Sequence, residues 1–178
     1  MIGMRVLKGV VFVGLLVLAG CGDDKADTPY GDEEVVSVYR SEINSAIDEV
    51  NAVEGALREM AVGSTGKATG ENLAAACLLL EARLVAVLVQ LDAIAPPRKL
   101  SGTHADMRAA IELRREACEK IAAGWQVEQE QSFELAEPIY EAAEMLLSQA
   151  REKLALVDEV LGKVDVALGV EQESNPTG

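Results

Sequence analysis

Apolar residues recur at steps of three and four along four long segments of the chain. The segments are residues 33–60, 71–95, 101–125 and about 138–168, and short polar connections join them. A repeat near 3.6 residues places such side chains on one face of an α-helix, whereas strands repeat every two residues. The sequence therefore predicts an all-α fold, an antiparallel up-down four-helix bundle.

Turn and capping residues set the expected limits of these helices. Asp32 precedes the first segment as a candidate N-cap, and a stretch with three glycines, residues 63–70, interrupts the chain after it. Pro96 and Pro97 end the second segment, because proline lacks the amide donor that a helix interior needs. Thr103 followed by Asp106 resembles a capping box at the start of the third segment.

The amino terminus has the three features of a secretory signal. Arg5 and Lys8 are followed by an uncharged apolar stretch, residues 9–20, that ends in the small residues of the run Leu18-Ala19-Gly20-Cys21. A stretch of about a dozen residues fits the core of a signal peptide, whereas a membrane-spanning helix needs roughly 20. We expect residues 1–20 to be a cleaved signal peptide.

The run that ends in Cys21 resembles the lipobox of bacterial lipoproteins. The resemblance implies that Cys21 carries fatty acyl chains such as palmitate and becomes the first residue of the mature protein. It also implies a lipid anchor on the extracytoplasmic side of the cell membrane or the outer membrane. Gly22 follows the cysteine and the first acid comes one residue later, so the choice between the two membranes stays open.

Residues 21–31 have no apolar periodicity and are rich in turn-forming residues, so we expect a lipidated terminus followed by a flexible tether. The predicted bundle occupies residues 32–168, and the fourth helix starts between residues 132 and 138. We expect residues 169–178 to be a disordered tail.

The acidic composition excludes nucleic acid as a partner. Residues 1–20 hold two of the 16 Lys and Arg and no acid, so the remainder carries 14 positive and 30 negative side chains, a formal charge of −16. Such a surface repels phosphate backbones and anionic lipid head groups. Membrane attachment is therefore expected through the lipid on Cys21.

Two further cysteines, Cys77 and Cys118, are predicted to form a disulfide. Their midpoint falls between residues 97 and 98, in the connection between the second and third segments, so an antiparallel hairpin brings them to the same height. Disulfides persist outside the cytoplasm. The alternative is a pair of reduced cysteines in the core, which behave as small apolar side chains.

The segment 71–95 is apolar on two faces, because its few strongly polar residues form two narrow strips on opposite sides. A bundle helix normally hides one apolar face. The second face is therefore either covered by a neighbour at close approach or presented to another copy of the chain or an envelope protein. The candidate interface residues on this face are Leu78, Ala82, Val85, Ala86 and Val89.

No catalytic, cofactor or metal site is predicted. His104 is the only histidine, and it suits a capping or seam position better than a role as a base. The Glu-x-x-His pairs of dimetal bundles and the Cys-x-x-Cys-His motif for haem attachment are both absent from the sequence.

The lipobox, the acidic tether and the helical body, with Pro96, Pro97, Leu100 and His104 at one connection, together resemble small helical-bundle lipoproteins of bacteria. This resemblance implies no activity. We expect a lipid-anchored interaction or structural protein of the cell envelope, without catalytic activity. The alternative is a binding protein for a small hydrophobic or cationic ligand held between helices.

Overall fold

The structure is a computed structural model that describes residues 27–63 and 69–170. Four long helices confirm the predicted all-α bundle, and the main departure from the expected limits is α3, which continues to Glu130 and not to about residue 125. The elements in chain order are β1 Asp27–Thr28, β2 Gly31–Asp32, α1 Glu33–Val62, α2 Gly70–Ala93, the 3-10 turn η2 Arg98–Leu100, α3 Ser101–Glu130 and α4 Phe133–Ala167. The predicted signal peptide, residues 1–20, and Cys21 lie outside the described residues.

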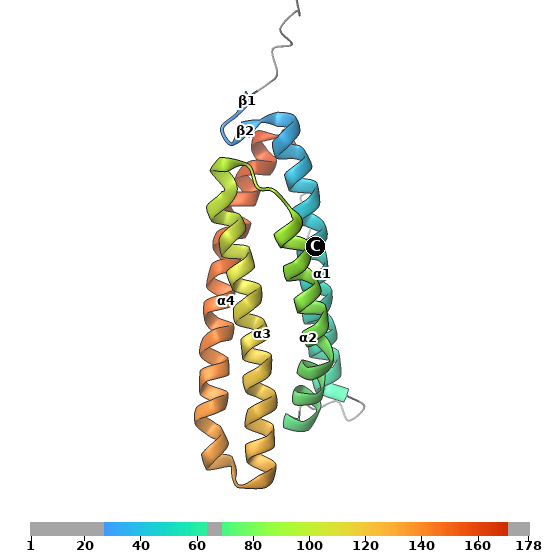
Figure 1. Cartoon of the computed structure of the whole chain (residues 1–178), viewed down its shortest axis with the longest axis vertical. Coiled ribbons are helices and arrows are strands. Elements are labelled where there is room, and N and C mark those ends of the chain that lie inside the picture. The colour runs from blue at the N-terminus through green and yellow to red at the C-terminus, as the bar shows by residue number, and fades with distance from the viewer. Residues whose placement is uncertain (1–26, 64–68, 171–178) are drawn as a thin grey trace, which may run out of the picture.

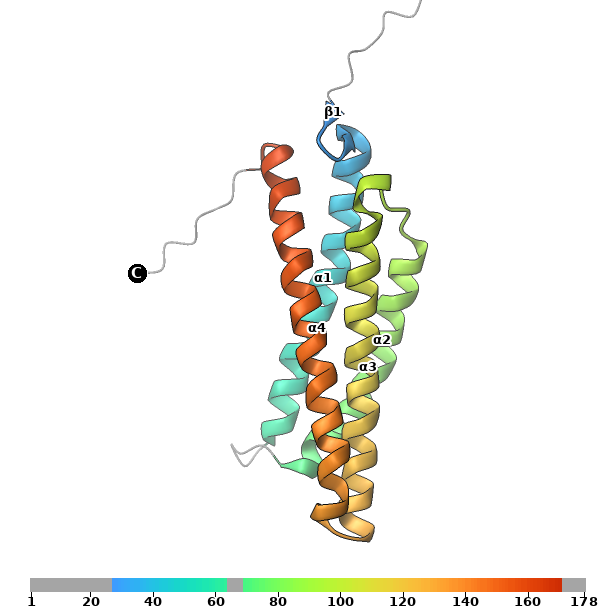
Figure 2. The same ribbon diagram turned by 90° about the vertical axis from the view of Figure 1, so that its left-hand side faces the viewer.

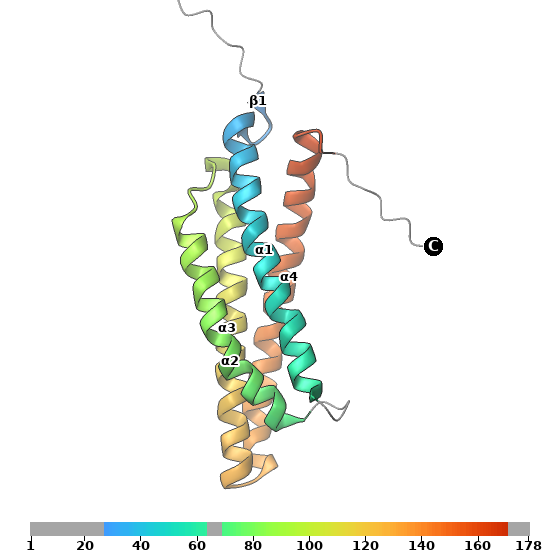
Figure 3. The ribbon, with the colours of Figure 1, turned by 90° about the vertical axis from the view of Figure 1, so that its right-hand side faces the viewer.

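The helices run alternately up and down, with α1 and α2 on one side and α3 and α4 on the other (Figure 1). Packing is extensive between α1 and α2, between α2 and α3, and above all between α3 and α4, whereas α1 and α4 approach each other at only a few positions. Figures 2 and 3 show these two helices from opposite sides. The α1–α4 side is therefore the least closely packed side of the bundle.

All four helices contribute apolar side chains to one continuous core. Burying each large aliphatic side chain stabilises the fold by about 1.5–3 kcal/mol. The most completely buried large side chains are Tyr39, Ile43, Leu91, Leu100, Met107, Ile111, Val36, Val87, Val157 and Val164.

Local capping explains where α1 and α3 begin, and one predicted cap is wrong. The Asp32 carboxylate accepts from the amides of Glu34 and Val35 at 3.1 and 3.2 Å, as expected for an N-cap. The proposed capping box of Thr103 and Asp106 does not form, because the turn η2 leads directly into α3 two residues earlier. Asp106 instead pairs with Lys153 of α4 at 2.7 Å.

Residues 27–31 are not the flexible tether that the sequence predicted. Asp27 and Thr28 pair antiparallel with Asp32 and Gly31 in a two-strand hairpin at the bundle end where α1 begins (Figure 1). Lys99 donates to the Pro29 carbonyl at 2.7 Å and holds the hairpin against η2. The predicted tether is therefore reduced to residues 21–26, which lie outside the described residues.

The carboxyl end of α4 closes with a glycine cap. Gly169 has a φ of +68°, a left-handed conformation that glycine adopts without strain. The Val170 amide then donates back to the Asp165 carbonyl at 3.0 Å, as in other glycine-terminated helices. Residues 169 and 170 thus belong to the helix end, and the rest of the predicted tail lies outside the described residues.

Gly124 lets α3 and α4 approach closely beside Tyr140. A Cβ added at Gly124 would lie 2.7 Å from the Tyr140 ring, whereas one added at Gly55 of α1 would meet nothing within 4 Å. We expect Gly124→Ala to lower the free energy of unfolding by about 1–3 kcal/mol through overpacking. The matched Gly55→Ala should raise it by up to about 1 kcal/mol, since alanine is the better helix former. Urea unfolding of both variants checks this pair, and equal effects would contradict the packing assigned to Gly124.

Candidate functional site

The second apolar face of α2 is exposed. The predicted interface residues Leu78, Val85 and Val89 are 62, 42 and 65 % exposed, and Ala82 and Ala86 are exposed between them. Together with Ala75 and Ala93 they form what we call the α2 outer face. No neighbouring helix within the described residues covers this face, so the alternative of deep burial is wrong.

Charged pairs border the α2 outer face on both sides. Arg83 pairs with Glu49 of α1 at 2.7 Å, and Arg115 of α3 lies 3.7 Å from Glu81. Arg115 also pairs with Glu119, and Asp92 of α2 pairs with Arg108 of α3, so both borders carry charges of both signs.

At the carboxyl end of α2 the apolar surface continues onto α1. A groove of about 540 Å³ begins beside Ala93 and is lined in part by Val35 and Val38, both more than half exposed. Glu34 and Glu42 also line this groove, so the apolar surface that continues onto α1 at the hairpin end is flanked by two acids.

Among the described residues, α2 is the one helix long and apolar enough to cross a membrane. Length and composition alone do not distinguish a membrane span from a core helix of a soluble bundle. Here α2 supplies Cys77, Leu80, Leu84, Val87 and Leu91 to the core, so leaving the bundle would expose these side chains and the partner surfaces that they cover.

Cys77 of α2 and Cys118 of α3 face each other in the core, but they are free thiols in this structure. Their exposed fractions are 1 and 7 %. The hydrogen bond between the two thiols, and then burial, raises the pKa of Cys77. The same hydrogen bond lowers the pKa of Cys118. The two thiols are neighbours, as predicted, but they are not at disulfide distance in this structure, and the disulfide stays a prediction.

His104 lies in the core and not in an open site. The residue is 9 % exposed, and its Nδ1 lies 3.4 Å from the Tyr39 hydroxyl. Burial raises the pKa of Tyr39 to about 12. Burial also lowers the pKa of His104, although a hydrogen bond with the Leu91 backbone acts in the opposite direction and raises it. The pair therefore links α1 to α3 as two neutral groups.

His104 is expected to make stability depend on pH. Because its pKa is lower in the folded state, the unfolded chain takes up the proton first, with a pKa of about 6.5. The contribution of the neutral ring is complete above that pH and is lost progressively as the pH falls below it. Urea unfolding at pH 8 and pH 5.5 should show a smaller loss for His104→Gln than for the wild type. Equal losses would contradict this account.

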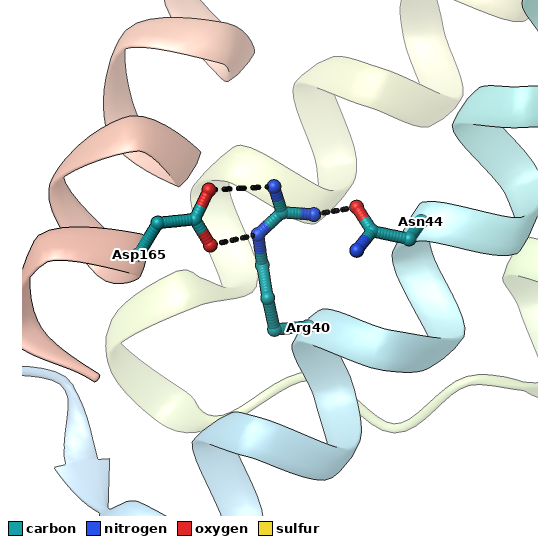
Figure 4. Close-up of polar contacts among 3 residues, drawn as sticks. All are labelled: Arg40, Asn44 and Asp165. Carbon is teal, nitrogen blue, oxygen red and sulfur yellow. Dashed lines mark hydrogen bonds and ion pairs between the residues drawn. The ribbon is translucent and has the colours of Figure 1, made fainter. Parts of the chain in front are cut away.

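A bidentate ion pair joins α1 to α4 near the hairpin end. Arg40 donates from Nε and Nη2 to the two carboxylate oxygens of Asp165 at 2.6 and 2.8 Å, and it also donates to Asn44 (Figure 4). Both charged side chains are 17 % exposed. The two parallel hydrogen bonds fix their relative orientation, so they hold α1 and α4 together where few other contacts do.

In the other half of the bundle, α1 and α4 border a groove of about 400 Å³. We call it the α1–α4 groove, and its lining residues are Glu54, Leu57, Arg58, Ala61, Leu73, Arg114, Leu147 and Arg151. A smaller cavity of about 50 Å³ shares four of these residues and reaches Leu80, Leu84 and Cys118. The groove is thus open at the surface and narrows toward the core.

Three arginines and one glutamate make the α1–α4 groove positive. Arg114 pairs with Glu54, and its side chain is 11 % exposed. Burial lowers the pKa of Arg114, the charge of Glu54 opposes this, and the charge of Arg151 adds to the lowering. Arg58 and Arg151 are exposed, and within the described residues neither has an acidic partner within ion-pair distance.

Sequence reasoning missed this arginine cluster. The three side chains are far apart along the chain, on α1, α3 and α4. One signal was available: the midpoint of Arg114 and Arg151 falls at residues 132–133, in the connection between α3 and α4. The same symmetry that aligned the two cysteines would therefore have aligned these two arginines.

Within residues 27–63 and 69–170, no group of three or more His, Cys, Asp or Glu side chains is placed to hold a metal ion. Comparisons with protein-family models, with curated proteins and with solved structures found no match. The functional argument therefore depends on the sequence and the geometry of this chain.

Proposed function

We propose that this chain is a lipid-anchored, extracytoplasmic helical-bundle protein of the bacterial envelope, which acts by interaction and has no catalytic activity. The run Leu18-Ala19-Gly20-Cys21, after Arg5 and Lys8, supports the anchor. The observation that carries the interaction is the exposed α2 outer face. Exposed apolar surface on this scale is typical of sites that contact another protein.

The spacing on α2 favours a second copy of the chain as the partner. Ala75, Leu78, Ala82, Val85 and Val89 follow one another at alternate steps of three and four. This is the heptad spacing of a two-stranded coiled coil. Alanines among the larger side chains let two helices approach closely, and the arginines at the two borders, Arg83 and Arg115, reduce the repulsion that the acidic surface would otherwise cause.

The size of the surface indicates that the lipid anchor assists the association. A helix of this length presents a strip of roughly 36 by 10 Å, so two copies would bury about 700 Å², below the roughly 1,200 Å² of stable interfaces. Val35 and Val38 enlarge the contact at one end. Anchoring both copies in one membrane raises their effective concentration and offsets the small area.

The orientation of such a dimer follows from the position of the amino terminus. The chain enters the bundle at Asp27, at the end where α2 finishes (Figure 1). Two upright copies anchored in one membrane share a two-fold axis perpendicular to it. Their α2 helices then run parallel, and each heptad position contacts its own equivalent.

The predicted disulfide between Cys77 and Cys118 is compatible with the proposed α2 interface. Cys77 on α2 and Cys118 on α3 are neighbouring free thiols; they are not at disulfide distance, so a small approach of the two helices would have to accompany their oxidation in an extracytoplasmic compartment. Closing a loop of about 40 residues stabilises a fold by roughly 4 kcal/mol in the chain-entropy model. The bond would hold α2 in the bundle while its outer face stays free.

Intact mass spectrometry tests the anchor and the disulfide together. The protein should be extracted from membranes with detergent and without reductant. The proposal predicts a chain that begins at Cys21, is heavier by its acyl chains and gains two hydrogens on reduction. A chain that begins at Met1 would overturn the anchor, and two free thiols would overturn the disulfide.

A second candidate function, ligand binding between helices, is favoured by the α1–α4 groove. The alternative predicted from the sequence was a hydrophobic or cationic ligand. The arginines that line the groove favour an anionic ligand instead.

A further inference from the structure

The α1–α4 groove combines two properties that seldom occur together on an acidic protein. Its mouth is positive, with Arg58 on α1 and Arg151 on α4, and its walls are apolar, with Leu57, Leu73 and Leu147. The volume of about 400 Å³ lies within the range of small-molecule sites. Both properties come from helices that the core already fixes in place.

The positive charge of the groove is not balanced by nearby acids. Glu54 is the single acid among the lining residues, and it pairs with the deepest arginine, Arg114. Burial lowers the pKa of Arg114, and the charge of Arg151 is near enough to lower the pKa of Arg114 further. Arg151 donates from Nε to the Leu147 carbonyl at 3.2 Å, but within the described residues neither Arg58 nor Arg151 has an acidic partner, in a chain with 30 acids.

Leucines continue the apolar surface from the mouth toward the core. Leu57 and Leu147 line both the groove and the inner cavity of about 50 Å³, where Leu80 and Leu84 form the far wall. A ligand with a charged head at Arg58 and Arg151 would therefore place an attached chain against leucine side chains. A small polar anion would leave these walls in water.

We infer that the α1–α4 groove binds an anionic amphiphile, a single acyl or alkyl chain that ends in a carboxylate or a phosphate. Arg58 and Arg151 hold the anionic head by charge-assisted hydrogen bonds. Leu57, Leu73 and Leu147 cover the chain, which contributes about 0.8 kcal/mol for each buried methylene. This site lies between α1 and α4 and is separate from the α2 outer face, so it does not depend on self-association.

Equilibrium dialysis of the full chain tests this inference. The protein is reconstituted in phosphatidylcholine vesicles and dialysed against empty vesicles of equal lipid content, so that excess label on the protein side measures binding to the protein. The labelled probes are octanoate, octyl phosphate, octylammonium and acetate. We expect saturable binding of octanoate or octyl phosphate, and the probe that binds more tightly identifies the preferred head group. Octylammonium and acetate should each bind at least tenfold more weakly.

A double variant and a matched control locate the site. Arg58→Gln with Arg151→Gln changes two exposed side chains and should weaken binding of the anionic probe about tenfold or more. Arg98→Gln removes an exposed arginine on η2, outside the residues that line the groove, and should leave binding unchanged. The inference is overturned if neither anionic probe binds saturably, if octylammonium binds as tightly, or if the double variant binds as well as the wild type.

Discussion

Replacing Cys21 with serine should release the protein from membranes. The expected change is large, because serine cannot form the thioether that carries the acyl chains, and each methylene withdrawn from the bilayer costs about 0.8 kcal/mol. The remainder of the chain is acidic overall, with 14 positive and 30 negative side chains, so anionic lipid head groups would not hold it at the membrane. Fractionation after cell lysis should place the wild type with the membranes and Cys21→Ser in the soluble fraction or in an unprocessed precursor.

The matched control for this experiment is Cys77→Ser, which changes a cysteine inside the bundle. That variant should keep its lipid and sediment with the membranes. If Cys21→Ser still sediments with membranes and is processed at an unchanged position, the anchor is wrong. Membrane attachment by α2 would then be the explanation to test, since α2 is apolar and long enough to span.

Placing charges on the α2 outer face should abolish self-association. Val85→Lys with Val89→Glu puts two charged side chains on the proposed contact, where each faces the same charge on the other copy and loses its contact with water. Burying such groups costs a few kcal/mol, so we expect apparent affinity between copies to fall about 100-fold. Energy transfer between copies labelled at the carboxyl terminus, in phosphatidylcholine vesicles, measures this change.

Folding should survive these substitutions, since both valines are exposed, and the unfolding midpoint checks it. Leu156→Lys with Val166→Glu makes the same chemical change at exposed positions of α4, 58 and 72 % accessible. This control should keep the wild-type energy transfer. If both double variants lose energy transfer equally, the loss is a general effect of charge and not of the α2 outer face. If neither variant loses energy transfer, the copies do not associate through this face.

The helices could be predicted from the sequence because one periodic signal determines each of them. Asp32 caps α1 as expected, since its bond to two amides depends only on residues next to it in the chain. The hairpin at residues 27–32 could not be predicted in this way, because contacts such as that of Lys99 with Pro29 join distant parts of the chain. The capping box at Thr103 failed for a similar reason: η2, with Leu100 fully buried, starts the helix earlier.

The candidate sites likewise include features that the sequence could predict and features that only the packed bundle reveals. The spacing of Cys77 and Cys118 located their contact, but proximity does not determine the redox state. The two apolar faces of α2 were visible in the sequence, and only the packed bundle revealed that Leu78 and Val89 are on the exposed one. The spacing of Arg114 and Arg151 would have aligned these two arginines, but only the packed bundle places Arg58 of α1 beside them.

The central claim is that anchored copies meet side by side through α2, and oxidation of a single introduced cysteine tests it most directly. In a parallel pair, Val89 faces its own equivalent within the Cα separation of about 4.4–6.8 Å that a disulfide needs. Val89→Cys in native membranes should therefore give a covalent dimer on mild oxidation, whereas Ser148→Cys, exposed on α4, should stay monomeric. A Val89→Cys protein that forms no more dimer than the Ser148→Cys control would contradict the account.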